Sequence, residues 1–329
     1  MKLNKIAAVT SLAILASPAI ASDISLDEAF KKIDVYGSVN GNVIKKRDFD
    51  HQSQIQLAAL GMTGMHETDF GKAFITLESQ WADDVKQQGE DLYLAQANII
   101  FKTNGYGKIV LGNGYKGAYL NLFKPVDIFD VNNQHRSSGS TLFVNQSQLG
   151  TNTVSYTTPA VLVGLTLSAG VISAFDDNDT EADNFALRLK YKAKNFSLAL
   201  QRSDANANDW EDSSGEDVEF ERYIGMAEYH NDTFAIAATY ELAKDHKTYG
   251  EGRMWGSSAT YHATDALSFK LGYQNSDYDT EGGKWYNDSL YLANVSYSIS
   301  DHMRVYVEAA EFRENSQPDN VAIGTEFKF

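Results

Sequence analysis

The sequence contains no cysteine and only four prolines among its 329 residues. Without cysteine, the protein has no disulfides, no thiolate metal ligands and no thiol nucleophile. Pro125, Pro159 and Pro318 fall between the runs that we expect to be strands, as an uninterrupted sheet requires. Beyond residue 21 no apolar run approaches the length of a membrane-spanning helix. Any part of the chain that crosses a membrane must therefore do so as a sheet.

Basic residues are also scarce, with 28 Lys and Arg against 44 Asp and Glu. This acidic excess argues against a nucleic-acid partner. The seven histidines are scattered, without metal-ligand spacing and without an adjacent nucleophile. Residues 176–181 are dense in carboxylates but lack the glycine of an EF-hand loop, which favours solvated loop charge over a calcium site. We expect no enzyme activity, no cofactor and no metal.

The first 21 residues have the composition of a secretory signal. Lys2 and Lys5 give a basic start, residues 6–20 are mostly apolar, and Ala19 and Ala21 form a small-x-small cleavage site. Removal of this segment takes away two lysines and no acid, so the net charge changes from −16 to −18. Residues 22–32 then form a short N-terminal extension, in which Ser25 and Glu28 match a capping box and predict a helical turn.

From residue 33 onward, apolar and polar residues alternate in short runs. Val35, Val39 and Val43, for example, alternate with Asn40 and Asn42. Alternation with a period of two indicates strands with one apolar face. The chain contains 16 such runs, at residues 33–46, 53–65, 72–82, 92–103, 106–112, 150–158, 165–174, 185–193, 196–203, 220–230, 233–243, 253–262, 267–276, 288–299, 303–312 and 321–329.

The connections between these runs alternate between tight turns and long acidic loops. Tight turns occur at 104–105, 194–195, 231–232, 264–265 and 300–301, and long loops at 83–91, 175–184, 204–219 and 277–287. This layout is typical of an outer-membrane barrel. Aromatic residues near strand ends on the apolar face suit girdles at the two membrane interfaces. They are Tyr191, Phe196, Tyr229, Phe234, Tyr240, Tyr261, Phe269, Tyr273, Tyr297, Phe327 and Phe329. We predict an all-β, 16-stranded antiparallel transmembrane β-barrel over residues 33–329.

Residues 113–148 interrupt the alternation for about thirty residues, which is long for a loop in a compact domain. The segment carries enough apolar residues to pack against something, among them Tyr115, Tyr119, Phe123, Phe129 and Phe143. We expect it to fold into the lumen of the barrel and to narrow the pore.

Several segments resemble the general trimeric porins of Gram-negative bacteria. They are Val35-Tyr36-Gly37, Leu60-Gly61-Met62-Thr63-Gly64, the run from Tyr106 to Asn113, and a last strand that alternates up to Phe329. The resemblance implies a 16-stranded barrel, a homotrimer and diffusion of small hydrophilic solutes. It also implies that Phe327 and Phe329 form the terminal signal read by the β-barrel insertion machinery.

The resemblance implies a pore narrowed by the third loop, with arginines on the wall opposite loop carboxylates. Here the sequence departs from the family, because the corresponding positions Ala59, Asn113 and Thr157 are not basic and residues 137–148 contain no acid. We expect Asp127 and Asp130 to face no arginine cluster, with bases supplied from another strand. The candidate constriction residues are Asp127, Asp130, His135, Arg136, Lys116, Asn113 and Glu78, and the candidate lumen-wall bases are Arg188, Lys190 and Lys192.

These observations favour a water-filled channel for passive diffusion of small hydrophilic solutes and ions, with weak cation selectivity from the acidic loops. The alternatives are a substrate-specific porin for oligosaccharides, in which the loop aromatics stack on sugars, or an exported soluble β-sheet binding protein. We expect a homotrimer in the Gram-negative outer membrane, in contact with lipid and lipopolysaccharide. Small residues on the lipid side would let barrels approach closely, at Gly37, Gly41, Ala58 and Gly64.

Overall fold

The structure is a computed structural model that describes residues 32–81, 92–132, 149–172, 184–207, 218–246, 250–280, 284–313 and 318–329. The signal segment 1–21 and almost all of the extension 22–32 lie outside the described residues, so both remain predictions. The helices of the described residues include none long and apolar enough to cross a membrane. That finding does not bear on crossing by strands.

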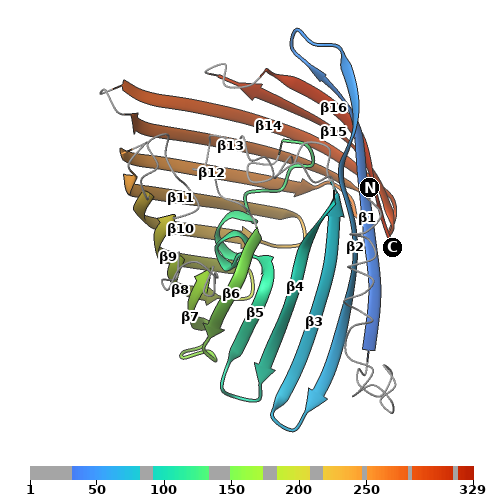
Figure 1. The fold of residues 1–329 in the computed structure, drawn as a ribbon. Coiled ribbons are helices and arrows are strands. Elements are labelled where there is room, and N and C mark those ends of the chain that lie inside the picture. The colour runs from blue at the N-terminus through green and yellow to red at the C-terminus, as the bar shows by residue number, and fades with distance from the viewer. Residues whose placement is uncertain are drawn as a thin grey trace, which may run out of the picture.

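The described residues form 16 antiparallel strands in a closed barrel, in which each strand pairs with its neighbours in sequence and β1 pairs with β16 (Figure 1). Every predicted run is a strand, and the boundaries differ by a few residues. The strands are β1 (Lys32–Lys46), β2 (His51–Thr68), β3 (Gly71–Trp81), β4 (Leu92–Thr103), β5 (Lys108–Tyr115), β6 (Leu149–Thr157), β7 (Leu165–Ile172), β8 (Asn184–Lys192), β9 (Phe196–Ala207), β10 (Val218–His230), β11 (Phe234–His246), β12 (Gly250–His262), β13 (Leu267–Thr280), β14 (Lys284–Ser300), β15 (Met303–Phe312) and β16 (Asn320–Lys328).

The two faces of the sheet follow the alternation in the sequence. On β1, Val39 and Val43 are 43% and 48% exposed, whereas Asn40 and Asn42 between them are buried. We call the face with the buried polar residues the inward face and the other the outward face. In a water-soluble protein the apolar face of a sheet is buried in the core and the polar face meets water, because apolar side chains avoid solvent. Exposed apolar side chains all around a closed sheet suit a surface covered by lipid.

Aromatic side chains gather near the short-turn end on the outward face. Phe234, Tyr261 and Phe269 lie on three consecutive strands, with ring centroids 5.1 Å and 6.4 Å apart. All three side chains are exposed. This is the arrangement predicted for an aromatic girdle at a membrane interface.

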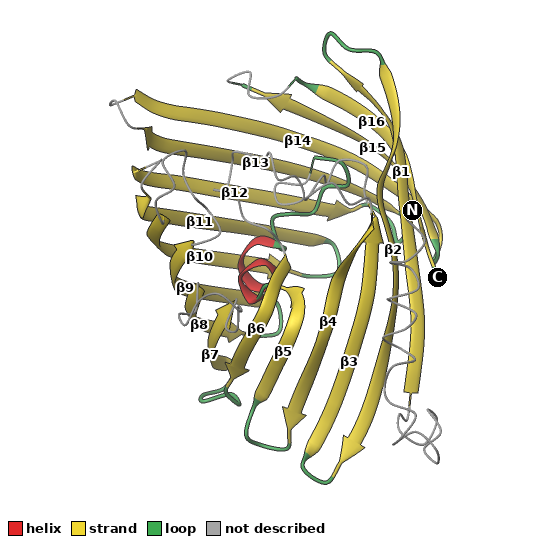
Figure 2. Cartoon of the chain, viewed as in Figure 1, coloured by secondary structure: helices red, strands yellow, loops and turns green. Residues whose placement is uncertain are grey.

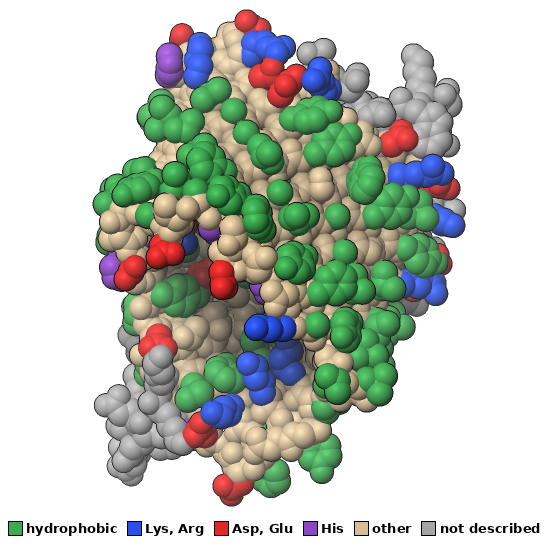
Figure 3. All heavy atoms as spheres, turned by 180° about the vertical axis from the view of Figure 1, so that it is seen from behind, with side chains coloured by type: hydrophobic (Ala, Val, Ile, Leu, Met, Phe, Trp, Pro, Cys, Tyr) green, Lys and Arg blue, Asp and Glu red, His purple; other side chains and the backbone are tan. Residues whose placement is uncertain are grey.

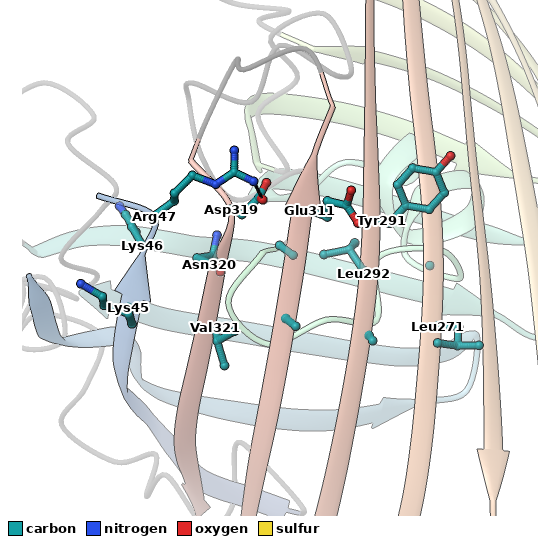
Figure 4. A pocket seen from close by; sticks show the side chains of 14 residues that line it. Lys45, Lys46, Arg47, Leu271, Tyr291, Leu292, Glu311, Asp319, Asn320 and Val321 are labelled. Atoms are coloured by element: carbon teal, nitrogen blue, oxygen red, sulfur yellow. Dashed lines mark hydrogen bonds and ion pairs between the residues drawn. The ribbon is translucent and has the colours of Figure 1, made fainter. Parts of the chain in front are cut away.

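An ion pair and a backbone hydrogen bond fasten the seam between the first and last strands at one end. At the long-loop end the Arg47 side chain forms an ion pair with Asp319, and the Arg47 N–H donates to the Asp319 carbonyl at 2.7 Å. Figure 4 shows Arg47 directed toward Asp319, with Val321 further along β16. A closed sheet leaves no strand edge with unpaired backbone groups, which a bilayer could not satisfy.

The loop between β5 and β6 differs from the prediction in where it begins. The sequence predicted that residues 113–148 lie outside the strands, but β5 continues through Tyr115 with a register shift between Gly112 and Gly114. Asn113 is therefore a strand residue. Residues 116–132 are described and include a short π-helix, η1 (Tyr119–Phe123), drawn in red in Figure 2. The remainder, 133–148, lies outside the described residues.

Candidate functional site

The described part of the β5–β6 loop begins with a helical turn that the alternation pattern did not predict. The Lys124 N–H donates to the Tyr119 carbonyl at 2.8 Å, the five-residue step of a π-helix. Leu122 and Phe123 at its end are fully buried. The turn gathers apolar side chains on one side of the loop, and packing of that side supplies the stability that a single helical turn lacks.

This apolar side packs against the inward face of the barrel wall. Leu122, Phe123 and Phe129 belong to one buried cluster with inward-facing wall residues, namely Ala199, Ile224, Met226, Met254, Leu290, Leu292, Ala310 and Phe312. Complete burial of an apolar side chain of this size contributes about 1.5–3 kcal/mol relative to exposure. The loop is therefore held to the wall by its own core.

Phe129 fits because the wall residue beneath it is a glycine. A β carbon on Gly272 of β13 would lie 2.5 Å from Cε2 of the Phe129 ring. No real β carbon comes that close to a neighbouring carbon, so an alanine at this position would have to displace the ring or the strand. The glycine thus sets how closely the loop approaches the wall at this point.

Polar contacts follow the loop along the wall from one strand to the next. The Lys190 ammonium of β8 donates to Asn121 Oδ1 at 2.8 Å. The Ser258 hydroxyl of β12 donates to the Pro125 carbonyl at 2.9 Å. The Lys270 ammonium of β13 donates to the Ile128 carbonyl at 2.9 Å. These wall side chains satisfy loop carbonyl and amide groups that would otherwise be buried without partners.

A carboxylate of β15 holds the last described residues of the loop. Glu308 accepts three successive backbone N–H groups, from Asp130 at 2.6 Å, Val131 at 3.0 Å and Asn132 at 2.7 Å. Its Oε2 also accepts from Asn294 Nδ2 at 2.9 Å. Consecutive N–H groups that converge on one anion form a nest, and each such charge-assisted bond is stronger than a neutral one.

Asp130 is buried in the same cluster and is paired with bases. The Arg304 guanidinium donates to both carboxylate oxygens, with Nη1 at 3.0 Å from Oδ2, and Lys270 Nζ lies 3.5 Å from Oδ2. Burial alone would raise the pKa of the Asp130 carboxyl, but the hydrogen bond from Arg304 and the charges of Lys270 and Arg304 outweigh it. The pKa therefore lies below its ordinary value. Asp130 thus faces one arginine and one lysine rather than an arginine cluster, and these bases come from β15 and β13 instead of from β8 as expected.

The comparisons with known proteins agree with this architecture. A family model described as Gram-negative porin matches residues 8–317. The chain belongs to the Gram-negative porin family. No curated protein matches it.

Solved structures with the same fold include three porins or outer-membrane proteins at low identity, so the likeness concerns the fold. OmpF of Salmonella typhi in complex with daunomycin superposes with a TM-score of 0.75 at 17% identity, over 92% of this chain and 99% of that one. The trimer form of OmpT, an outer-membrane protein of Vibrio cholerae, gives 0.71 at 16% identity over 91% and 99%. An anion-selective porin from Comamonas acidovorans gives 0.71 at 15% identity over 91% and 99%.

The other predicted constriction residues of this porin lie in different surroundings. Asp127 is buried, and its Oδ2 accepts from the Tyr119 hydroxyl at 3.0 Å. Lys116 is half-buried close to Arg222, and burial together with the Arg222 charge lowers the pKa of Lys116 to about 8. Asn113 Oδ1 accepts from the Asn152 N–H at 2.8 Å, across the mouth of the loop. His135 and Arg136 lie outside the described residues.

Glu78 belongs to a polar network on the part of the wall formed by β1 to β5. It accepts from the Tyr36 hydroxyl at 2.7 Å and from Gln80 Nε2 at 2.5 Å. Gln80 in turn contacts the hydroxyls of Tyr115 and Tyr93 at 2.9 Å and 2.8 Å. The loop contacts described above lie mainly on β8 to β16, so Glu78 is on a different part of the wall from the Asp130 cluster.

Arg188, Lys190 and Lys192 lie at inward-facing positions of β8, because Leu187, Leu189 and Tyr191 between them are exposed on the outward face. Arg188 reaches the start of the loop. A β carbon on Gly117 would lie 2.7 Å from Arg188 Nη1. The bases that pair with Asp130 are Lys270 and Arg304 rather than these three.

The sequence reasoning overlooked Arg304, Lys270 and Glu308 as loop partners. The signal was present, since all three occupy polar positions of alternating runs and thus face inward. The alternation of polar and apolar residues does not show how far each strand is shifted along the barrel axis relative to the loop. Among the described residues, no group of three or more His, Cys, Asp or Glu side chains is placed to hold a metal.

Two of the five loop aromatics proposed for sugar stacking are committed to packing. Phe123 and Phe129 are 1% and 3% exposed, so neither offers a ring face to a solute. Tyr115 and Tyr119 stack on each other with centroids 5.8 Å apart. Phe143 lies outside the described residues. The two buried phenylalanines therefore pack the loop against the wall instead of stacking on a sugar, which weakens the case for an oligosaccharide site.

Proposed function

We propose that this protein forms a water-filled channel for passive diffusion of small hydrophilic solutes and ions across the outer membrane. Membership of the Gram-negative porin family and the closed barrel support an outer-membrane channel. The observation that carries the proposal is the polar inward face, with buried Asn, Gln, Ser and Glu side chains on strand after strand. A barrel of 16 strands is wide enough to hold an aqueous lumen.

The β5–β6 loop narrows this lumen from one side. Its contacts run along the inward face of β8 to β16, which supports a constriction between the loop and the wall of β1 to β6. In this arrangement Lys116 and Asn113 border the passage, and Glu78 lies on the facing wall within its hydrogen-bonded network. Asp130 acts as an anchor, since its carboxylate is buried and paired. Asp127 is also buried and accepts from the Tyr119 hydroxyl, so it belongs to the loop core.

Selectivity arises from two zones of opposite charge. The long loops at the mouth are rich in carboxylates, and the chain without its signal carries −18, so the mouth concentrates cations. Charges in a water-filled mouth are screened over about 8–10 Å near physiological salt, so we expect their effect to decline as salt rises. Arg188, Lys190 and Lys192 lie deeper in the lumen and oppose it. Because the two zones act in opposite directions, the channel has weak cation selectivity at low salt.

The protein functions as a homotrimer in the outer membrane. A solved relative in fold is described as a trimer form, which supports this assembly. Gly41, Ala58 and Gly64 are small residues at outward positions where barrels could approach closely. Gly37 is covered by the ring of Phe329 and does not offer the bare surface expected for it. Residues 1–21 direct export, the insertion machinery reads Phe327 and Phe329, and lipid with lipopolysaccharide surrounds the barrel.

Planar-bilayer recording tests the channel directly. Stepwise conductance from purified protein supports it, and reversal potentials under a salt gradient report selectivity. We expect a modest preference for cations at 0.1 M ionic strength that fades by about 1 M, where the Debye length falls to about 3 Å. Absence of conductance from folded protein would refute the channel. Release of the protein from cells without detergent would favour the exported soluble alternative.

A further inference from the structure

Six neighbouring inward-facing side chains in one lateral row of the barrel are all hydrogen-bond donors or bases. Six residues on consecutive strands β4 to β9 are direct cross-strand partners of one another, and the row is Lys102, Lys108, Thr157, Ser168, Arg188 and Gln201. Their outward-facing neighbours Ile109, Tyr156, Leu167 and Leu187 are exposed apolar residues, which fixes the row on the lumen side. The row lies toward the short-turn end of the barrel, since Lys102 and Lys108 flank the tight turn between β4 and β5.

The centre of this row has the donors of an oxyanion site. The Thr157 and Ser168 hydroxyls lie 3.0 Å apart. Lys108 is the cross-strand neighbour of Thr157 on one side, and Arg188 is that of Ser168 on the other. Neighbouring strands lie about 4.8 Å apart, so both long basic side chains can reach an anion seated over the two hydroxyls. We call Lys108, Thr157, Ser168 and Arg188 the oxyanion cradle.

Neighbouring groups position Arg188 and Lys102 within the row. Arg188 Nη1 donates to Gln201 Oε1 at 3.3 Å, and the guanidinium lies against the backbone of Gly117 in the loop. Lys102, beside Lys108, lies over the Phe74 ring at 4.8 Å from its centroid. The cradle is thus positioned where the loop leaves the wall, at the edge of the passage.

The electrostatics of the row are repulsive in the absence of an anion. Lys108 interacts with the charges of Lys102 and Arg188, and Lys190 interacts with Arg188, Lys192 and Lys108. Like charges directly opposite each other on a sheet, as at Lys102 and Lys108, are destabilising. Among the described residues, none of these five bases forms an ion pair, and Glu228 is the acid whose charge reaches Lys190. A bound anion would relieve this repulsion.

Figure 3 shows a hollow on the face opposite the view of Figure 1, with Lys and Arg side chains along one edge and Asp and Glu side chains along another. Around this hollow the basic and the acidic side chains lie on different edges. A local excess of bases focuses positive potential into a cleft and raises the local concentration of anions.

We propose that the oxyanion cradle binds phosphate groups of solutes in transit, namely inorganic phosphate and small phosphate esters. Arginine and lysine with two hydroxyls supply charge-assisted and neutral hydrogen bonds to the oxygens of a phosphate, which presents several acceptors at once. Binding is weak and reversible, so that the solute can leave again. The proposal rests on the channel function.

The test is block of chloride current by inorganic phosphate in a planar bilayer, at constant ionic strength and pH 7.5. We expect wild-type current to fall in a saturable manner as phosphate replaces chloride. The variant Lys108→Gln with Arg188→Gln should raise the half-blocking concentration roughly tenfold or more, since each removes a hydrogen bond to a charged group. Thr157→Val with Ser168→Ala removes the two hydroxyls without changing charge and should also weaken block.

The matched control is Lys328→Gln, which removes an inward-facing base that is paired with Glu326 at 3.0 Å on β16, on the other side of the barrel from the cradle. It should leave the phosphate block within twofold of wild type. An equal loss of block in this control, or no saturable block in a conducting wild type, would overturn the cradle and leave the channel standing. Failure of folded protein to conduct at all would instead refute the channel. Heat-dependent gel migration confirms that each variant is folded.

Discussion

Gly37 and Phe329 join the two ends of the barrel. The Gly37 N–H donates to the Phe329 carbonyl at 3.1 Å, and the Phe329 N–H donates to the Gly37 carbonyl at 3.0 Å. The ring of Phe329 lies over Gly37, where a β carbon would be 2.6 Å from ring carbon Cε1. The terminal aromatic therefore covers a glycine of the first strand and closes the sheet at the short-turn end.

Deletion of Phe329, or its replacement by Asp, should reduce the amount of folded protein in the outer membrane. Deletion removes two backbone hydrogen bonds at the seam and the ring that covers Gly37, whereas Phe329→Asp removes the ring and places a charge there. Gly37→Val should act in the same direction by displacing the ring. Gly41→Ala is the control, because its β carbon would meet only the Gln54 carbonyl at 3.7 Å. Wild-type levels of heat-modifiable Phe329 variant would contradict the prediction.

Gly272→Ala should loosen the β5–β6 loop, because the new β carbon occupies the place of the Phe129 ring. Overpacking of this kind costs about 1–3 kcal/mol. We expect noisier single-channel current and a lower free energy of unfolding. Phe129→Leu in the same chain should recover part of the loss, since the smaller side chain vacates that space. If the double variant is as unstable as the sum of the two single variants, the Gly272–Phe129 contact does not set the loop position.

Arg304→Met should leave the buried Asp130 carboxylate short of its main partner and should destabilise the loop. Removal of one member of a buried ion pair costs about 3–5 kcal/mol, and the remaining Lys270 reduces this to roughly 2–3 kcal/mol. Arg202→Met, which removes an exposed arginine from the outward face of β9, should cost less than about 1 kcal/mol. Denaturant unfolding of both variants measures the difference.

The ion pair between Asp130 and Arg304 predicts that the loop resists acid. The pKa of Asp130 is lowered below its ordinary value of 3.8, so the unfolded state takes up the proton first. The contribution of Asp130 to stability is therefore fully present above pH 3.8 and is lost as the pH falls through the lower folded-state pKa. Single-channel current noise between pH 7 and pH 4 should stay constant in the wild type. A rise in noise already near pH 5 would show that another group controls the loop.

Lys116 should make selectivity depend on pH in the weakly alkaline range. Its pKa of about 8 means that the ammonium is charged at pH 7 and largely neutral at pH 9. Loss of this positive charge beside the passage should lower the ratio of anion to cation permeability. In Lys116→Met, the ratio should stay near the wild-type value at pH 9 throughout. Reversal potentials at pH 7, 8 and 9 decide this, and an identical pH response in the variant would assign the effect elsewhere.

The assembly should be a trimer that resists detergent until heated. Outward-facing Gly41, Ala58 and Gly64 provide a surface of small side chains on β1 and β2. Ala58→Trp places a large ring on that surface and should shift unheated samples toward monomer on a gel. Leu271→Trp, at an exposed outward position of β13, is the control and should leave the trimer intact. A monomer band from unheated wild type in every detergent would contradict the assembly.

The strands could be predicted from the sequence because their signal is local. The alternation of Val39 and Val43 with Asn40 and Asn42 requires only that a strand present opposite faces to lipid and to the lumen, and a β-strand repeats every two residues. The tight turns and the terminal Phe329 are local signals of the same kind. The π-helix at Tyr119–Phe123 was not predicted, since one turn without a cap or a repeat gives no periodic signal.

The sequence alone determined that this chain is a 16-stranded barrel with one apolar face, one polar face and a long loop after the fifth strand. Only the tertiary structure decided what that loop touches. Asp130 and Arg304 are 174 residues apart in sequence, and their contact depends on where the loop crosses the wall. The cradle of Lys108, Thr157, Ser168 and Arg188 likewise depends on the register of four strands. Alternation fixes the face on which a side chain lies, but the relative shift of paired strands fixes its neighbours.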